Sequence, residues 1–104
     1  MNEVRTTDAF DAWFAGLRDR RARFRIQARI DRLSLGNPGV HRSLGGGLYE
    51  LKVDHGPGYR IYYAYRGNAL VVLLCGGDKR TQQHDIEFAT AMKKLLEARN
   101  GTED

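Results

Sequence analysis

The sequence has few of the features that mark secreted, disulfide-bonded or membrane-spanning proteins. Cys75 is the only cysteine in 104 residues, so no disulfide can form within the chain. No segment approaches the roughly 20 apolar residues that a membrane-spanning helix needs, and no basic stretch followed by an apolar run marks a signal peptide. These absences predict a protein of the reducing cytoplasm, with no membrane partner and with Cys75 as a buried thiol.

The chain also lacks an excess of acidic residues. It has 17 lysines and arginines against 13 acidic residues, and seven of the arginines fall between Arg18 and Arg32, opposed only by Asp19 and Asp31. Such a stripe favours a polyanion or an acidic protein as partner. It is equally typical of a solvated helix face whose arginine stems cover apolar surface. The length and the 41% hydrophobic content predict a single packed domain over residues 1–104.

Two segments of the N-terminal third have the apolar spacing of amphipathic helices. The first begins after Thr6 and Thr7, whose side-chain oxygens can cap a helix, and the second begins at Asp19. The second ends in the glycine- and proline-containing segment 36–39. The two apolar stripes consist of Phe10, Trp13, Phe14 and Leu17, and of Ala22, Ile26, Ile30 and Leu33. The tight link near Gly16 predicts a helical hairpin with its arginines outward.

After the triple glycine 45–47, the chain changes to the alternation that is typical of strands. In the segment 48–53, Glu50 and Lys52 share one face. In the segment 59–65, Arg60 and Tyr62 share one face. If the two segments pair as antiparallel neighbours, Lys52 and Arg60 project from the same side of the sheet.

A third strand is predicted at 70–75, which is apolar throughout, as in a central strand covered on both faces. A two-residue turn at Gly67 and Asn68 joins it to the second strand. Residues 2–5 are a candidate edge strand, and Thr81 can cap a last helix. The predicted fold is α+β: an N-terminal helical hairpin packed on a small antiparallel sheet, followed by a C-terminal helix.

The ordered set of these motifs resembles the RelE/ParE superfamily, and within it the HigB-like addiction module killer proteins. The similarity lies in a glycine-rich entry, a strand ending in a basic residue, a "GPGYR" reversal into an aromatic strand, and an apolar strand closing in "GGDK", all within residues 44–86. The segment 20–39, "RRARFRIQARIDRLSLGNPG", is also similar to that branch's arginine-rich second helix and its end. Together the resemblance covers nearly the whole chain.

The resemblance implies a RelE-like fold and a toxin of a type II toxin–antitoxin module. Its partner would be a helix-turn-helix antitoxin of the HigA type. RelE-like and HigB-like members cleave messenger RNA at the ribosome and so inhibit translation, whereas ParE-like members poison DNA gyrase, and a catalytically inactive member would bind only its antitoxin. A shared fold does not choose between these activities. An mRNA interferase, an endoribonuclease that needs no cofactor, is the leading hypothesis.

RNA cleavage by a 2′-hydroxyl needs a base, an acid and stabilisation of charge on the phosphorane. We expect Arg60 to stabilise the transition state, and Lys52 or Lys79 to transfer a proton or bind phosphate. The resemblance supports these positions, since RelE-like toxins use basic residues at about these strand positions. The alternatives are a surface ion pair of Arg60 with Glu50 and ordinary exposed lysines at strand ends.

Four further side chains are candidates for substrate binding. Tyr62 could stack on a base or serve only sheet packing, and Arg80 could join the cations from the end of the sheet. His55 and His84 are candidates for reaching the same cleft and transferring protons. The histidines lack the spacing of metal ligands, so no metal site is expected.

Overall fold

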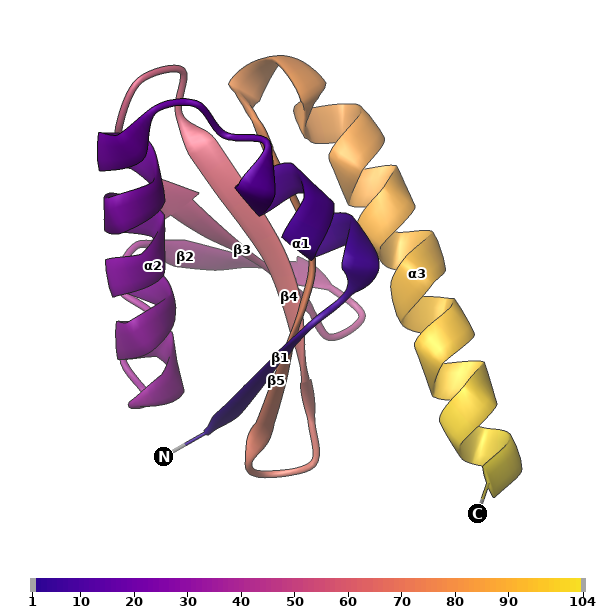
Figure 1. Ribbon diagram of the computed structural model, residues 1–104. Helices are drawn as coiled ribbons and strands as arrows, with labels where there is room; N and C mark the ends of the chain where they lie inside the picture. The colour runs from indigo at the N-terminus through magenta and orange to yellow at the C-terminus, as the bar shows by residue number, and fades with distance from the viewer. Residues whose placement is uncertain (1, 104) are drawn as a thin grey trace.

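The computed structural model describes residues 2–103 and forms a five-stranded sheet covered by helices on both faces (Figure 1). The strand order is β1-β5-β4-β3-β2. The elements, in chain order, are β1 (Glu3–Thr6), α1 (Asp8–Ala15), α2 (Arg20–Ser34), β2 (His41–Gly45), β3 (Leu48–Val53), β4 (Tyr59–Arg66), β5 (Leu70–Asp78), a 3₁₀ turn η1 (Lys79–Thr81) and α3 (Gln82–Glu103). No helix in this part of the chain has the length and apolar character needed to cross a membrane.

The sheet separates two apolar cores. On one face, α1 and α2 pack through Phe10, Ile26 and Ile30 against inward residues of β3, β4 and β5. On the other face, α3 packs through Ala89 against side chains of β4 and β5 that include Tyr62. The helices therefore cover both faces of the sheet, so any functional side chain on the strands lies at an edge or an end of the sheet.

The helix starts follow the capping residues seen in the sequence. The Thr7 hydroxyl accepts a hydrogen bond from the Phe10 N–H, and the Asp19 carboxylate accepts from the N–H groups of Arg21 and Ala22. The last helix starts differently from the prediction. Asp78 caps η1 and forms a reciprocal pair of bonds with Thr81, so Thr81 is the third residue of this capping box.

Three parts of the predicted fold need correction. The sheet is mixed, because β1 pairs with β5 in parallel. The strand β2 was not predicted, and it adds an edge beyond β3. The turn between β4 and β5 has three residues, 67–69, and only Gly67 has a positive φ.

The helices α1 and α2 exist as predicted, but α1 lies over β5 and α2 over β3, so the sheet is their main packing partner.

The glycines that follow the apolar strand are explained by close helix packing. A Cβ on Gly76 would lie 2.3 Å from the Trp13 ring, and a Cβ on Gly77 would lie 1.8 Å from Asp85 Oδ2. Both distances are too short for any side chain, so these positions let α1 and α3 approach β5 from opposite faces. Both glycines belong to β5, which extends past the predicted end of the strand to Asp78.

Candidate functional site

Lys52 and Arg60 are direct cross-strand partners on β3 and β4, so they leave the same face of the sheet. This is the face that α3 covers, because Tyr62 on the same side of β4 packs in the α3 core. Lys52 is exposed, whereas Arg60 is only 7% exposed. At the edge of the α3 layer, Lys52 therefore lies in solvent and Arg60 is buried.

A buried carboxylate, Glu50, lies beside them at 3% exposure. Arg42 Nε donates to Glu50 Oε1 at 2.8 Å, and Gln82 Nε2 donates to Glu50 Oε2 at 2.9 Å. Arg60 Nε lies 3.7 Å from Glu50 Oε2, an ion-pair distance that is longer than a hydrogen bond. Glu50 therefore connects β2, β4 and the start of α3 through one side chain.

These contacts set the charge of the cluster. Burial, which is the largest single influence, raises the pKa of Glu50, but the hydrogen bonds from Arg42 and Gln82, the charge of Arg42 and the Tyr62 hydroxyl together hold that pKa below its ordinary value. Glu50 is thus ionised at neutral pH. It pairs with Arg42 and Arg60, and Lys52 lines one polar hollow with these side chains without pairing to Glu50, so the cluster keeps a positive excess that suits an anionic ligand.

The protein's own groups hold the Arg60 guanidinium in place but do not satisfy all of its N–H groups. Its Nη1 donates to the Gly58 carbonyl at 3.0 Å, and its buried Nε has no hydrogen-bond acceptor among the described residues. Lys52 forms no ion pair with any acidic side chain that the structure describes. Its ammonium is free to contact a phosphate.

The cluster borders a polar hollow of about 230 Å³ at the β2–β3 edge. We call it the catalytic hollow after the roles that the sequence analysis predicted for Lys52 and Arg60, which both line it. Its lining comprises Val40, His41, Arg42, Glu50, Lys52, Arg60 and Gln82. Strands β2, β3 and β4 and the first residue of α3 all contribute to it. The arrangement can bind a phosphate or a similar anion through its cations, with Glu50 fixing two of them.

The other predicted site residues lie elsewhere. Lys79 and Arg80 are exposed in η1, where Arg80 pairs with Asp78 at 3.3 Å. His55 Nε2 lies 3.1 Å from the Asp19 carboxylate at the start of α2, and His84 is exposed on α3. None of these residues lines the catalytic hollow. Among the described residues, no group of three or more His, Cys, Asp or Glu side chains could hold a metal ion.

Tyr62 lies on the expected face, but its ring is fully buried. Burial and then the charge of Glu50 raise its pKa, so the phenol stays protonated at physiological pH. A ring in this position is out of reach of an RNA base. Packing under α3 is the role that its environment supports, in place of base stacking.

Sequence reasoning missed Arg42 and Gln82 and underestimated Glu50. The alternation of β3 placed Glu50 beside Lys52 and suggested only a surface pair with Arg60, whereas both partners of that pair are buried. Arg42 lies on the unpredicted strand β2, opposite Glu50 in register. Gln82 comes from a helix far along the chain, and no sequence signal joined it to this cluster.

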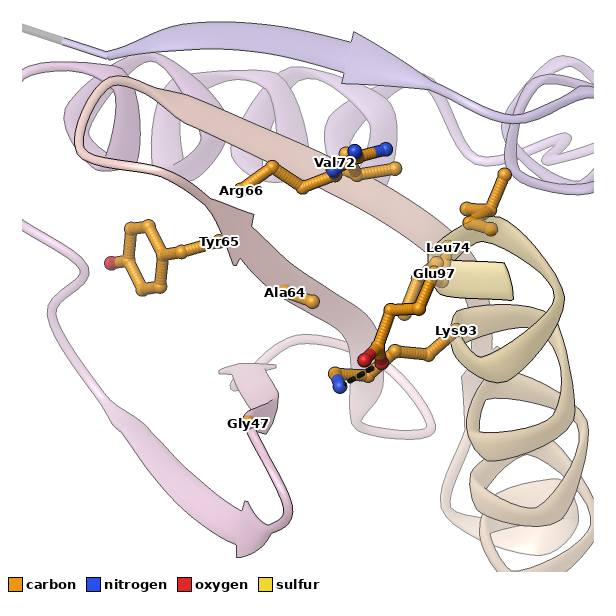
Figure 2. A pocket seen from close by; sticks show the side chains of 9 residues that line it. Gly47, Ala64, Tyr65, Arg66, Val72, Leu74, Lys93 and Glu97 are labelled. Atoms are coloured by element: carbon orange, nitrogen blue, oxygen red, sulfur yellow. Dashed lines mark hydrogen bonds and ion pairs between the residues drawn. The ribbon is translucent and has the colours of Figure 1, made fainter. Parts of the chain in front are cut away.

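A second hollow, of about 170 Å³, opens between α3, the C-terminal end of β4 and the N-terminal half of β5 (Figure 2). Ala64, Val72 and Leu74 give it apolar walls, and Lys93 is paired with Glu97 on the same helix. Its lysine is therefore already neutralised. Arg66 is the other cation in the lining of this hollow, whereas Arg42, Lys52 and Arg60 all line the catalytic hollow, which is therefore the stronger candidate site.

Comparison with known proteins gives two matches. Residues 12–97 match the family model described as "Phage derived protein Gp49-like (DUF891)". The chain is also similar to an uncharacterized protein of Haemophilus influenzae (strain ATCC 51907 / DSM 11121 / KW20 / Rd), with 45% identity over 94 residues. That alignment covers 90% of this chain and 95% of the relative. The family match includes every residue of the catalytic hollow.

Proposed function

Since the chain belongs to the phage-derived Gp49-like family, and since its sequence resembles HigB-like toxins, we propose that it is the toxin of a type II toxin–antitoxin module. In this proposal it cleaves messenger RNA at the ribosome, and a helix-turn-helix antitoxin of the HigA type neutralises it. The observation that carries the enzymatic part is the pairing of Lys52 with Arg60 on one face beside a polar hollow.

The chemistry follows from the charges around the hollow. When a ribose 2′-hydroxyl attacks the adjacent phosphorus, its oxygen–phosphorus bond forms, the bond to the 5′-oxygen breaks, and negative charge grows on the phosphate oxygens. Arg60, held by the Gly58 carbonyl and by Glu50, is preorganised to face that charge. Lys52, which is exposed, binds the phosphate or carries a proton to or from the reacting oxygens.

Arg42 supports this assignment from the edge strand. Its Nε is bonded to Glu50, and its side chain remains 57% exposed, so the rest of the guanidinium faces solvent at the rim of the hollow. A planar guanidinium in that position suits bidentate contact with a phosphate. Lys79 and Arg80 would act only if the RNA extends along the sheet end to η1.

The test is messenger RNA cleavage in a translation extract, with RNA ends mapped by primer extension. Lys52→Gln removes a cation that has no described partner, so we expect stability to stay within about 0.5 kcal/mol. Cleavage should fall about 100-fold, as for loss of one charge-stabilising group. Lys94→Gln, which removes an exposed lysine of α3, is the matched control and should cleave normally.

Two results would overturn the proposal. One is undiminished cleavage by Lys52→Gln, which would move the chemistry away from this hollow. The other is DNA breaks linked to gyrase, with translated RNA left intact, which would make the chain a gyrase poison. No effect of the wild-type chain in either assay would leave it as an antitoxin-binding protein without catalysis.

A further inference from the structure

A basic hollow of about 330 Å³ shares Val40 with the catalytic hollow. Val40 lines both hollows, and its side chain is 66% exposed, so it forms the ridge between them. The basic hollow, which we call the arginine hollow, is lined by Arg25, Arg29, Arg32, Gly39, Val40, Val53 and Asp54. The two hollows are therefore neighbours along the β2–β3 edge of the molecule.

The three arginines of this hollow have different tasks. Arg29 donates to the carbonyls of Lys52, Pro38 and Val40, at 2.6, 2.9 and 2.9 Å. Its guanidinium is therefore a structural tie between α2 and the segment that forms the ridge. Burial and then the nearby charge of Arg32 lower the pKa of Arg29.

Arg25 and Arg32 remain available to a ligand. Both are exposed, and neither forms an ion pair with an acidic side chain in the part of the chain whose side chains are described. Asp54 is the acidic residue in the lining, against three arginines. The hollow thus has a positive excess and two guanidinium groups that form no ion pair with the described acidic side chains.

We propose that Arg25 and Arg32 bind backbone phosphates of the RNA strand whose scissile phosphate lies in the catalytic hollow, with the strand crossing the ridge at Val40. This inference rests on the proposed function. RNA is favoured over an acidic protein because the arginine hollow shares Val40 with the catalytic hollow, so cations lie on both sides of one residue, and a nucleic acid strand carries a phosphate at every step along such a path. The binding recognises the backbone and not the base sequence.

The experiment measures binding without cleavage. The probe is a short single-stranded RNA whose 2′-hydroxyls are all methylated, so that no attacking group exists, and fluorescence anisotropy is recorded over a range of salt concentrations. The variant Arg25→Gln/Arg32→Gln should bind about tenfold more weakly. The slope of log K against log salt should become shallower by about 1.4, at about 0.7 for each lost phosphate contact on a single strand.

The matched control is Arg20→Gln/Arg23→Gln. It removes the same net charge from the same helix, but at 3.6 residues per turn these two arginines leave α2 on the opposite side from Arg25 and Arg32. We expect its salt slope to stay within a few tenths of the wild-type value. Equal effects of the two double variants would reduce the proposal to general charge attraction and overturn it.

The outcomes separate this inference from the proposed function. Unchanged RNA binding by Arg25→Gln/Arg32→Gln would overturn the inference, even if the wild-type chain cleaves RNA. A reduced slope in that variant would support the inference, even if the wild-type chain cleaves nothing in the translation extract. Loss of RNA binding on shortening the probe at one end only would further support a strand laid across the ridge.

Discussion

Replacing Glu50 by glutamine keeps the size of a buried side chain but removes its charge, and the consequence can be worked out from its contacts. Arg60 and Glu50 have exposures of 7% and 3%, so this pair is shielded from water on both sides. Removing one member of a buried ion pair leaves an uncompensated charge and costs about 3–5 kcal/mol. Because the glutamine carbonyl still accepts a hydrogen bond and Gly58 still holds Arg60, we expect a loss of about 3 kcal/mol.

A double-mutant cycle of Glu50→Gln also needs the single variant Arg60→Met and the variant that carries both changes. Arg60→Met leaves Glu50 with its bonds from Arg42 and Gln82, so its cost should be smaller, about 2 kcal/mol. The double variant removes both charges and should be more stable than the sum of the single losses predicts, by about 2 kcal/mol. Arg5→Gln is the control, because the ion pair of Arg5 with Glu3 is exposed on both sides, with side chains 67% and 62% exposed, and its loss should cost under about 1 kcal/mol.

Urea unfolding followed by tryptophan fluorescence gives these free energies. Trp13 is the only tryptophan in the sequence, and its ring packs against Phe10 and Tyr59 in the α1–α2 core, so it reports the loss of tertiary structure. A coupling below about 0.5 kcal/mol would refute the reasoning. It would mean that Arg60 is solvated well enough to stand without Glu50 and that the carboxylate does not fix the guanidinium.

Two further predictions follow from the same region. Because the pKa of Glu50 is lowered on folding, its ionised form stabilises the folded state. This stability is fully present above the ordinary pKa of 4.5 and is lost as the pH falls through the lower folded-state pKa. In an acid titration, the unfolding free energy of Glu50→Gln should therefore decline less than that of the wild type. An equally steep decline in both proteins would contradict this sign. Gly77→Ala places a Cβ 1.8 Å from Asp85 Oδ2, so we expect a loss of about 1–3 kcal/mol in urea unfolding and weaker RNA cleavage as α3 shifts Gln82 away from Glu50. Wild-type stability in that variant would show that α3 is not held tightly against β5.

The elements that the sequence predicted well are those whose signal is local. Apolar spacing on α2 and alternation on β3 and β4 depend on residues a few positions apart, and the structure confirms the helix, both strands and the faces of their side chains. The caps at Thr7 and Asp19 are local in the same way. The shared face of Lys52 and Arg60 followed because a short reversal leaves two alternating strands few ways to pair.

The parts that the sequence did not predict depend on distant partners. The strand β2 is mostly exposed, with His41, Arg42 and Ser43 in succession, so it has no apolar alternation and exists because β3 offers it an edge. The parallel pairing of β1 joins residues almost seventy positions apart, Glu3 with Leu70 and Val4 with Val71. The burial of Glu50 depends on that unpredicted strand and on Gln82. The sequence therefore predicted the two cations Lys52 and Arg60 but not the buried carboxylate between them.

The arginines of α2 show why a count of charges does not identify a binding surface. Arg29 belongs to the same run as Arg25 and Arg32, yet it satisfies three backbone carbonyls. One of these carbonyls belongs to Lys52 and another to Val40, so this single guanidinium ties α2 both to the strand that carries Lys52 and to the ridge between the hollows. In the RNA path proposed above, Arg25 and Arg32 would guide a strand toward Lys52 only while Arg29 holds that geometry. The same run of arginines thus contains one that binds the protein's own backbone and two that are proposed to bind a ligand, although in the sequence they look alike.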